Sequence, residues 1–192
     1  MLDANKILDE AQKITGLSYL GNPLFAEGFN QLIYSINHEA DLNEIGIQAQ
    51  HHRLIGVLSN MLRIEDAIIK NPKILDEQII APIVIVGLPR TGSTMTHRLL
   101  AADPRHTAML WWEGRYPAML PNEDRGHPSE RMNLGKAEVD AVVAASPDAL
   151  TIHPWDYKGA DEEILLLEHT FFSTVPESFM RLPSYSSWVE EQ

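Results

Sequence analysis

The stretch 83–94 constrains the fold of this chain more than any other part of the sequence. Its first four residues, 83–86, are consecutive β-branched side chains, which predict a buried strand. Residues 87–92 form a short loop bounded by glycines, and residues 93–102 have the composition of a helix. A strand, a glycine-bounded loop and a helix in this order direct backbone N–H groups and a helix N-terminus toward a phosphate group.

The glycine spacing matches the phosphate-loop pattern G-x-x-x-x-G-K-[ST] except at the lysine. Gly87 and Gly92 occupy the glycine positions, Ser93 replaces the lysine, and Thr94 follows. Since that lysine reaches the β- and γ-phosphates in nucleoside triphosphatases, its absence favours a shorter anion. Arg90 supplies a cation inside the loop, and its guanidinium can bind phosphate or sulfate oxygens in a forked geometry. The alternative is that residues 92–94 only cap a helix.

The sequence P-R-T-G-S-T after an apolar strand resembles the 5′-phosphosulfate loop of sulfotransferases that use 3′-phosphoadenosine 5′-phosphosulfate. The resemblance is closest to bacterial and tyrosylprotein-type members. It implies that Arg90 is a catalytic residue as well as a donor ligand. The residues implied to bind the donor are Pro89, Arg90, Thr91, Gly92, Ser93 and Thr94.

Residues 106–112 are expected to form a second strand, so that strand, helix and strand imply a right-handed parallel crossover. The predicted fold class is therefore α/β, a P-loop-type parallel sheet with flanking helices. A further helix is expected at residues 129–145. No later strands follow in the sequence, so we expect an incomplete sheet, and this chain to be the first part of a longer protein.

An all-helical region precedes the predicted sheet. Helices are expected over residues 2–14, 24–36 and 41–70, and the composition changes at residues 79–82. The predicted domains are thus an N-terminal helical region, residues 1–78, and a phosphosulfate-loop domain, residues 79–192.

Glu113 and Arg115 form a second group of candidate residues, just after the second predicted strand. In a parallel sheet the ligand crevice lies outside the carboxyl ends of the strands. An E-x-R arrangement follows the loop in tyrosylprotein-type sulfotransferases, and the resemblance implies that Glu113 is the catalytic base and that Arg115 contacts the substrate. The alternative is a surface ion pair between the two. His153 is a rival base, because cytosolic sulfotransferases use a histidine.

The resemblance implies in-line transfer of a sulfuryl group to a hydroxyl or amine of a small-molecule or peptide acceptor, without a metal. The family also has a later arginine and serine that bind the 3′-phosphate of the donor, and this sequence has no counterpart of them. Two alternatives remain open. One is a nucleotide kinase or triphosphatase, and the other is a non-catalytic interaction module with a relict phosphate loop.

The net charge and the composition limit the classes of binding partner that we expect for this chain. The net charge of −12, from 15 basic and 27 acidic residues, argues against a general nucleic-acid or anionic-membrane binder. Within residues 84–115, however, four arginines face two carboxylates, so the loop lies in a basic part of an acidic chain. The chain has no cysteine, no signal-peptide pattern and no apolar run of the ~20 residues that span a bilayer. We therefore expect a cytoplasmic location.

Overall fold

The structure is a computed structural model that describes residues 1–88, 90–124 and 126–192. The chain divides into two compact units, which are described separately. The first unit consists of Met1–Ile74 and Ile164–Gln192, and the second unit consists of Leu75–Glu163. The α-helices are α1 (Ala4–Thr15), α2 (Phe25–Glu39), α3 (Glu44–Lys70), α4 (Ser93–Ala101), α5 (Trp111–Arg115), α6 (Ser129–Ala145), α7 (Ala149–Ile152), α8 (Ile164–Leu167) and α9 (Pro183–Glu190). Three short 3₁₀ helices are η1 (Pro72–Asp76), η2 (Glu168–Thr170) and η3 (Val175–Ser178).

The helices of the first unit begin and end at residues that satisfy their free backbone groups. The Asp3 side chain accepts a hydrogen bond from the Lys6 amide at the start of α1, and Gly16 ends that helix with a φ of 69°. Asn43 caps α3 by accepting from the Gly46 amide at 2.8 Å. The three helices predicted for this region are therefore confirmed to within a few residues.

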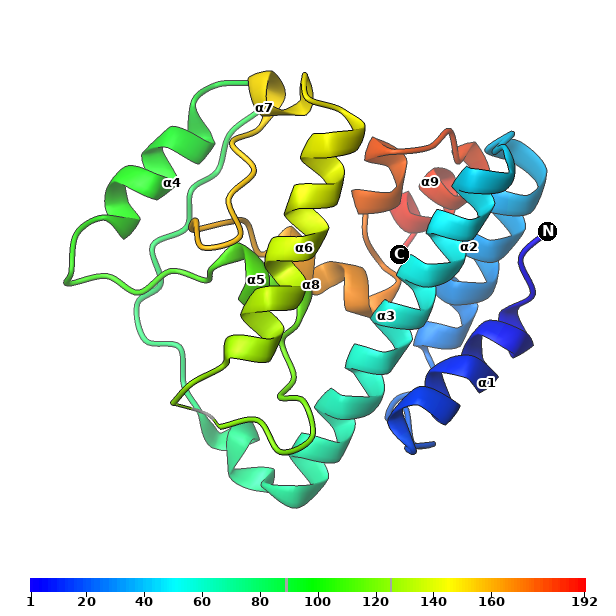
Figure 1. Cartoon of the computed structure of the whole chain (residues 1–192). Coiled ribbons are helices and arrows are strands. Elements are labelled where there is room, and N and C mark those ends of the chain that lie inside the picture. The colour runs from blue at the N-terminus through cyan, green and yellow to red at the C-terminus, as the bar shows by residue number, and fades with distance from the viewer. Residues whose placement is uncertain (89, 125) are drawn as a thin grey trace. The chain divides into compact units, whose positions relative to one another are not determined.

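The core of the first unit joins the start of the chain to its end. In Figure 1, α1, α2 and α3 lie beside one another, with α9 against α2. Buried side chains recur at helical spacing in these helices, as Leu54, Leu58 and Leu62 do in α3, so burial of one face holds each in place. The side chains with the least exposure include Ile7, Ile36, Leu58, Leu62, Phe171 and Tyr185.

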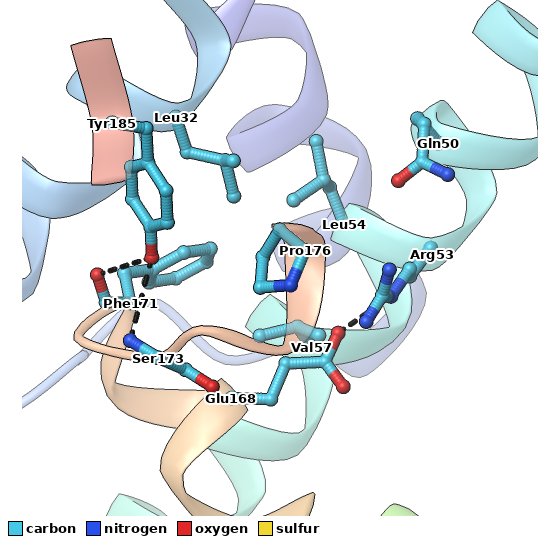
Figure 2. A pocket seen from close by; sticks show the side chains of 10 residues that line it. All are labelled: Leu32, Gln50, Arg53, Leu54, Val57, Glu168, Phe171, Ser173, Pro176 and Tyr185. Carbon is cyan, nitrogen blue, oxygen red and sulfur yellow. Dashed lines mark hydrogen bonds and ion pairs between the residues drawn. The ribbon is translucent and has the colours of Figure 1, made fainter. Parts of the chain in front are cut away.

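Polar contacts fasten η2 to α3 within this unit. The Arg53 Nε atom lies 2.6 Å from Glu168 Oε1, and both side chains are largely buried. The Asn60 side-chain amide lies 2.9 Å from His169 Nε2. Figure 2 shows a cavity beside Arg53 and Glu168, and the volume of this cavity is about 10 Å³. This is about the space that one water molecule needs, so the cavity is a packing gap.

In the second unit α5 packs against α6. Gly135 of α6 permits this approach, because a Cβ atom there would lie 2.8 Å from the Cβ of Trp112. Arg131, also on α6, places its guanidinium 4.9 Å from the centre of the Trp112 ring. The boundaries of α4 and α6 confirm the helices predicted at 93–102 and 129–145.

The predicted parallel sheet is wrong: no strand is present among the residues that the structure describes. The segment before α4 is an irregular coil in Figure 1, and its apolar side chains face solvent, with Ile79 87% and Val86 90% exposed. An extended segment becomes a strand only when a second backbone pairs with its N–H and C=O groups. Residues 83–86 have the side chains of a buried strand, but no described segment pairs with them.

The second predicted strand, residues 106–112, is also wrong. Only Leu110 makes a bridge, an isolated antiparallel one with Ala160, and α5 begins at Trp111. The Glu113 side chain accepts a hydrogen bond from the Leu110 amide and so satisfies a free N–H at the start of that helix. This local contact favours a helix at the end of the segment that the sequence predicted as a strand.

The compact units divide the chain differently from the predicted domains, because residues 164–192 group with the N-terminal helices. The domain boundary at residue 78 stays a prediction. Among the described helices, none is both long enough and apolar enough to cross a membrane.

Tyr185 gives a test of how the first unit is held together. Its hydroxyl donates to the Phe171 carbonyl at 2.9 Å, and burial raises its pKa to about 12. Folding therefore favours the neutral phenol, whose contribution is complete below about pH 10 and is lost as the pH rises toward 12. We expect Tyr185→Phe to lower the free energy of unfolding by about 1–2 kcal/mol at pH 7.

Urea unfolding at several pH values between 7 and 11.5 measures this effect. Tyr19→Phe is the matched control, since Tyr19 is 58% exposed. The Tyr185 variant should also lose less stability than the wild type above pH 10. Equal alkaline loss in all three proteins would contradict the role given to the Tyr185 hydroxyl.

Candidate functional site

Among its described residues, the loop before α4 has two with positive φ. Arg90 has a φ of 68° and Gly92, the N-cap of the helix, a φ of 90°. Glycine adopts this conformation without strain, whereas a non-glycine residue such as Arg90 is strained there, by about 1 kcal/mol. Strained backbone of this kind is concentrated at binding and catalytic sites. The loop therefore has a conformation that its local sequence alone does not favour.

The first turn of α4 has donors available for a ligand. The first bond of the helix runs from the Thr96 amide to the Gly92 carbonyl at 3.0 Å. Within the described residues, the amides of Thr94 and Met95 donate no hydrogen bond. The free N–H groups and the positive end of the helix dipole together favour an anion at this point.

A cavity of about 710 Å³ runs along α4 from its first residue to its last. This volume lies within the range of about 300–1,000 Å³ found for small-molecule sites. Arg90 and the first residues of the helix form its polar end, and Arg98 lines it together with apolar residues of α4 and with Ile152 and Pro154. The described lining residues are Arg90, Gly92, Ser93, Thr94, Met95, Arg98, Leu99, Ala102, Ile152 and Pro154.

The structure brings four of the six predicted donor ligands together on this cavity: Arg90, Gly92, Ser93 and Thr94. Thr91 is not among the described lining residues, and its hydroxyl donates to the Leu88 carbonyl at 2.6 Å. It therefore holds the turn of the loop. Pro89 lies outside the described residues. The ligand roles of all six remain predictions.

Two arginines at the cavity donate to main-chain carbonyls. Arg90 Nη1 lies 2.5 Å from the carbonyl oxygen of Ile152, and Arg98 Nη2 lies 2.8 Å from that of Pro154. The Arg98 Nε atom is buried and has no hydrogen-bond partner among the described atoms. Arg98 was not among the site residues that the sequence predicted. Its position four residues after Thr94, on the same helix face, is the signal that could have found it.

The basic residues of this part of the chain differ in how their charge is compensated. Arg105 pairs with Asp103 at 2.5 Å, and this contact lowers the pKa of Asp103 to about 2. Arg115 pairs with Glu138 at 2.8 Å. The hydrogen bonds of Arg90 and Arg98, by contrast, are to neutral carbonyl groups. Arg90 and Arg98 thus form no ion pair with a carboxylate among the described residues, although the Glu162 carboxylate accepts from the Thr94 hydroxyl at 3.4 Å.

Glu113 is half-buried on α5, and its Oε2 atom accepts from the Leu110 amide at 2.8 Å. It is not among the described lining residues of the cavity. The structure thus shows a capping role for this carboxylate, and its role as the base remains a prediction.

Arg115 connects α5 to α6. Besides the ion pair with Glu138, the Tyr116 hydroxyl donates to the other oxygen of the same carboxylate at 3.0 Å. Burial first, and then the charge of Glu138, raise the pKa of Tyr116 well above its usual range. Contact between Arg115 and a substrate stays a prediction.

His153 is not among the described lining residues, although both of its neighbours are. Its backbone is extended, with φ −137° and ψ 136°, and side chains alternate in direction along an extended segment. Its Nε2 atom lies 3.2 Å from Asp161 Oδ2. This geometry does not support His153 as a base acting within the cavity. No cluster of three or more His, Asp or Glu side chains suited to a metal occurs in the described part of the chain.

Comparisons with known proteins agree with the family that the sequence of the loop indicated. The sequence profile of the Sulfotransferase family matches residues 82–192. Among solved structures, sulfotransferase STF1 from Mycobacterium tuberculosis is 28% identical with a TM-score of 0.82, over 100% of this chain and 53% of that chain. Sulfotransferase STF9 from Mycobacterium avium is 23% identical with a TM-score of 0.82, over 100% of this chain and 50% of that chain. No curated protein matches the chain.

The likeness to STF9 concerns the fold alone, and this chain spans about half the length of both mycobacterial proteins. The profile match has a wider meaning, because it covers more than half of the chain and contains the loop, α4 and every described residue that lines the cavity. On this evidence the chain belongs to the Sulfotransferase family.

Proposed function

We propose that this chain binds the phosphosulfate group of 3′-phosphoadenosine 5′-phosphosulfate and serves its transfer to an acceptor hydroxyl or amine. The observation that carries the proposal is the polar end of the cavity. There the Arg90 guanidinium lies beside the first turn of α4, where the Thr94 and Met95 amides donate no hydrogen bond to described residues. These are the donors that a doubly charged phosphosulfate requires.

The residues present fit this donor. Gly92 and Arg90 hold the loop open with positive φ, and a Cβ atom at Gly92 would meet nothing within 4 Å, so space remains above the helix N-terminus. Ser93 in place of the phosphate-loop lysine leaves no ammonium group for a γ-phosphate. The cavity volume of about 710 Å³ accommodates more than the anion alone.

When bound, the donor supplies the sulfuryl group, and adenosine 3′,5′-bisphosphate is the product. Arg90 and the α4 amides would hold the phosphosulfate and stabilise negative charge on its bridging oxygen. Glu113 would accept the proton of the acceptor at the carboxylate oxygen that does not bond the Leu110 amide. The acceptor, a small molecule or a peptide, the lack of a metal and the cytoplasmic location stay predictions.

Thermal-shift titration tests the donor class. We expect adenosine 3′,5′-bisphosphate to raise the melting temperature of the chain, because a ligand that binds only the folded state stabilises it. ATP with Mg²⁺ should have little effect, since Ser93 replaces the lysine that reaches the γ-phosphate. The reverse order would support the kinase or triphosphatase alternative. No shift with either ligand would support a relict loop.

Arg90→Ala should weaken binding of adenosine 3′,5′-bisphosphate by about ten- to a hundredfold in isothermal titration. A hydrogen bond to a charged group contributes about 1.5–3 kcal/mol, and each 1.4 kcal/mol is tenfold. The matched control is Arg105→Ala, because Arg105 is exposed and already paired with Asp103. Equal affinities of the two variants would contradict the role of Arg90.

Glu113→Gln should leave binding of adenosine 3′,5′-bisphosphate within about twofold of the wild type, because glutamine keeps an oxygen that accepts from the Leu110 amide. Transfer should fall by about a hundredfold or more in an active form of the protein, since general base catalysis contributes this much. Titration measures binding, and sulfate release or product formation measures transfer. Equal loss of binding and transfer would show that Glu113 is structural.

A further inference from the structure

Residues 152–161, called here the brace, form one wall of the cavity. The carbonyl oxygens of Ile152 and Pro154 accept the hydrogen bonds from Arg90 and Arg98. Both guanidinium groups are therefore placed by the same short segment. Neither contact requires a particular side chain in the brace, so the sequence gives no direct sign of them.

The other end of the brace is bonded to the segment that leads into α5. The Gly159 carbonyl accepts from the Trp111 amide at 2.9 Å, and the Asp161 amide donates to the Met109 carbonyl at 3.0 Å. Leu110 and Ala160 form the antiparallel bridge between these bonds. The brace thus connects the arginines of the cavity with the helix that carries Glu113.

Arg98 lies against the middle of the brace. A Cβ atom at Gly159 would lie 2.8 Å from Arg98 Nη2, so a side chain there would displace the guanidinium from this position. The same Nη2 atom donates to the Pro154 carbonyl. The brace therefore encloses this guanidinium from two sides.

Asp161 joins the two ends of the brace. Its carboxylate is buried, with Oδ1 accepting from the Glu162 amide at 2.8 Å and Oδ2 lying 3.2 Å from His153 Nε2. His153 lies between the two residues whose carbonyls bind the arginines. The contact at the His153 side chain therefore ties the backbone between these two carbonyl groups to Asp161.

We infer that Asp161 is a positioning residue for the phosphosulfate: it holds His153 and thereby the carbonyl groups that place Arg90 and Arg98. The inference rests on the proposed function, because it assigns the brace to the same anion. Asp161 itself touches no ligand. Its effect passes through the backbone of residues 152–154 to the guanidinium groups.

Whether removal of the Asp161 carboxylate weakens or strengthens anion binding distinguishes a positioning role from a purely electrostatic one. Removing a carboxylate near an anion site strengthens anion binding if only charge matters, since like charges repel. Positioning gives the opposite result, because the guanidinium groups lose their fixed geometry. Asp148→Ala is the matched control: Asp148 is an exposed carboxylate just before the brace that makes no side-chain cap hydrogen bond, so that variant removes the same charge without loosening the brace.

Isothermal titration with adenosine 3′,5′-bisphosphate tests the inference on the wild type and on Asp161→Ala, Asp148→Ala, Arg90→Ala and the double variant Asp161→Ala/Arg90→Ala. We expect Asp161→Ala to weaken binding about tenfold and Asp148→Ala to leave it unchanged or tighter. In the Arg90→Ala background the same change at Asp161 should cost less than about threefold, because residues that act through one another are not additive. His153→Ala should reproduce Asp161→Ala.

The titration results separate a failure of the inference from a failure of the proposed function. If the wild type does not bind adenosine 3′,5′-bisphosphate, the proposed function is wrong, and the inference with it. If Arg90→Ala weakens binding but Asp161→Ala matches Asp148→Ala, the inference is wrong and the proposed function stands. Full additivity of Asp161 and Arg90 would also overturn it. Should Asp161→Ala fail to fold, judged by circular dichroism, wild-type affinity in His153→Ala would overturn the inference and a tenfold loss would support it.

Discussion

Two hydrogen bonds from arginine side chains to main-chain carbonyls determine where positive charge lies in the second unit. Arg90 and Arg98 bind the carbonyl oxygens of Ile152 and Pro154, which are neutral, so these two bonds hold the guanidinium groups without forming an ion pair. A carboxylate in the same place would hold the side chains equally well but would cancel the charge that an anion needs. The anion site of an acidic chain thus depends on the choice of carbonyl over carboxylate.

The backbone of the loop adds to this arrangement. Positive φ at Arg90 and Gly92 turns the chain so that α4 begins beside the guanidinium. Neither the strain at Arg90 nor the amides of the first turn contribute to the core of the protein. Features that cost stability and bury little apolar surface are expected where a protein binds a ligand.

The sequence was sufficient for elements that local chemistry determines. Helices α4 and α6 follow from composition, and the loop from the spacing of Gly87 and Gly92. The strand at residues 83–86 could not be decided locally, because β structure depends on a partner backbone that a single segment does not encode. Glu113 shows the same limit, since its contact with the Leu110 amide begins α5 within residues expected to be a strand.

The candidate site could likewise be predicted only where its residues are neighbours in the sequence. Ligands within the loop were found from their neighbours in sequence, whereas the contacts of Arg90 and Arg98 join residues more than fifty positions apart. Those contacts involve main-chain carbonyls, which every residue has, so no residue type marks Ile152 or Pro154. His153 could be noted as a base but not placed, because only the structure shows its pairing with Asp161.

A crystal structure of the chain with adenosine 3′,5′-bisphosphate would show directly whether the loop and the start of α4 bind the phosphosulfate group. We expect the 5′-phosphate at the polar end of the cavity, within hydrogen-bond distance of the Thr94 and Met95 amides and of the Arg90 guanidinium. A 5′-phosphate bound elsewhere, or a complex in which those amides remain without a ligand, would contradict it.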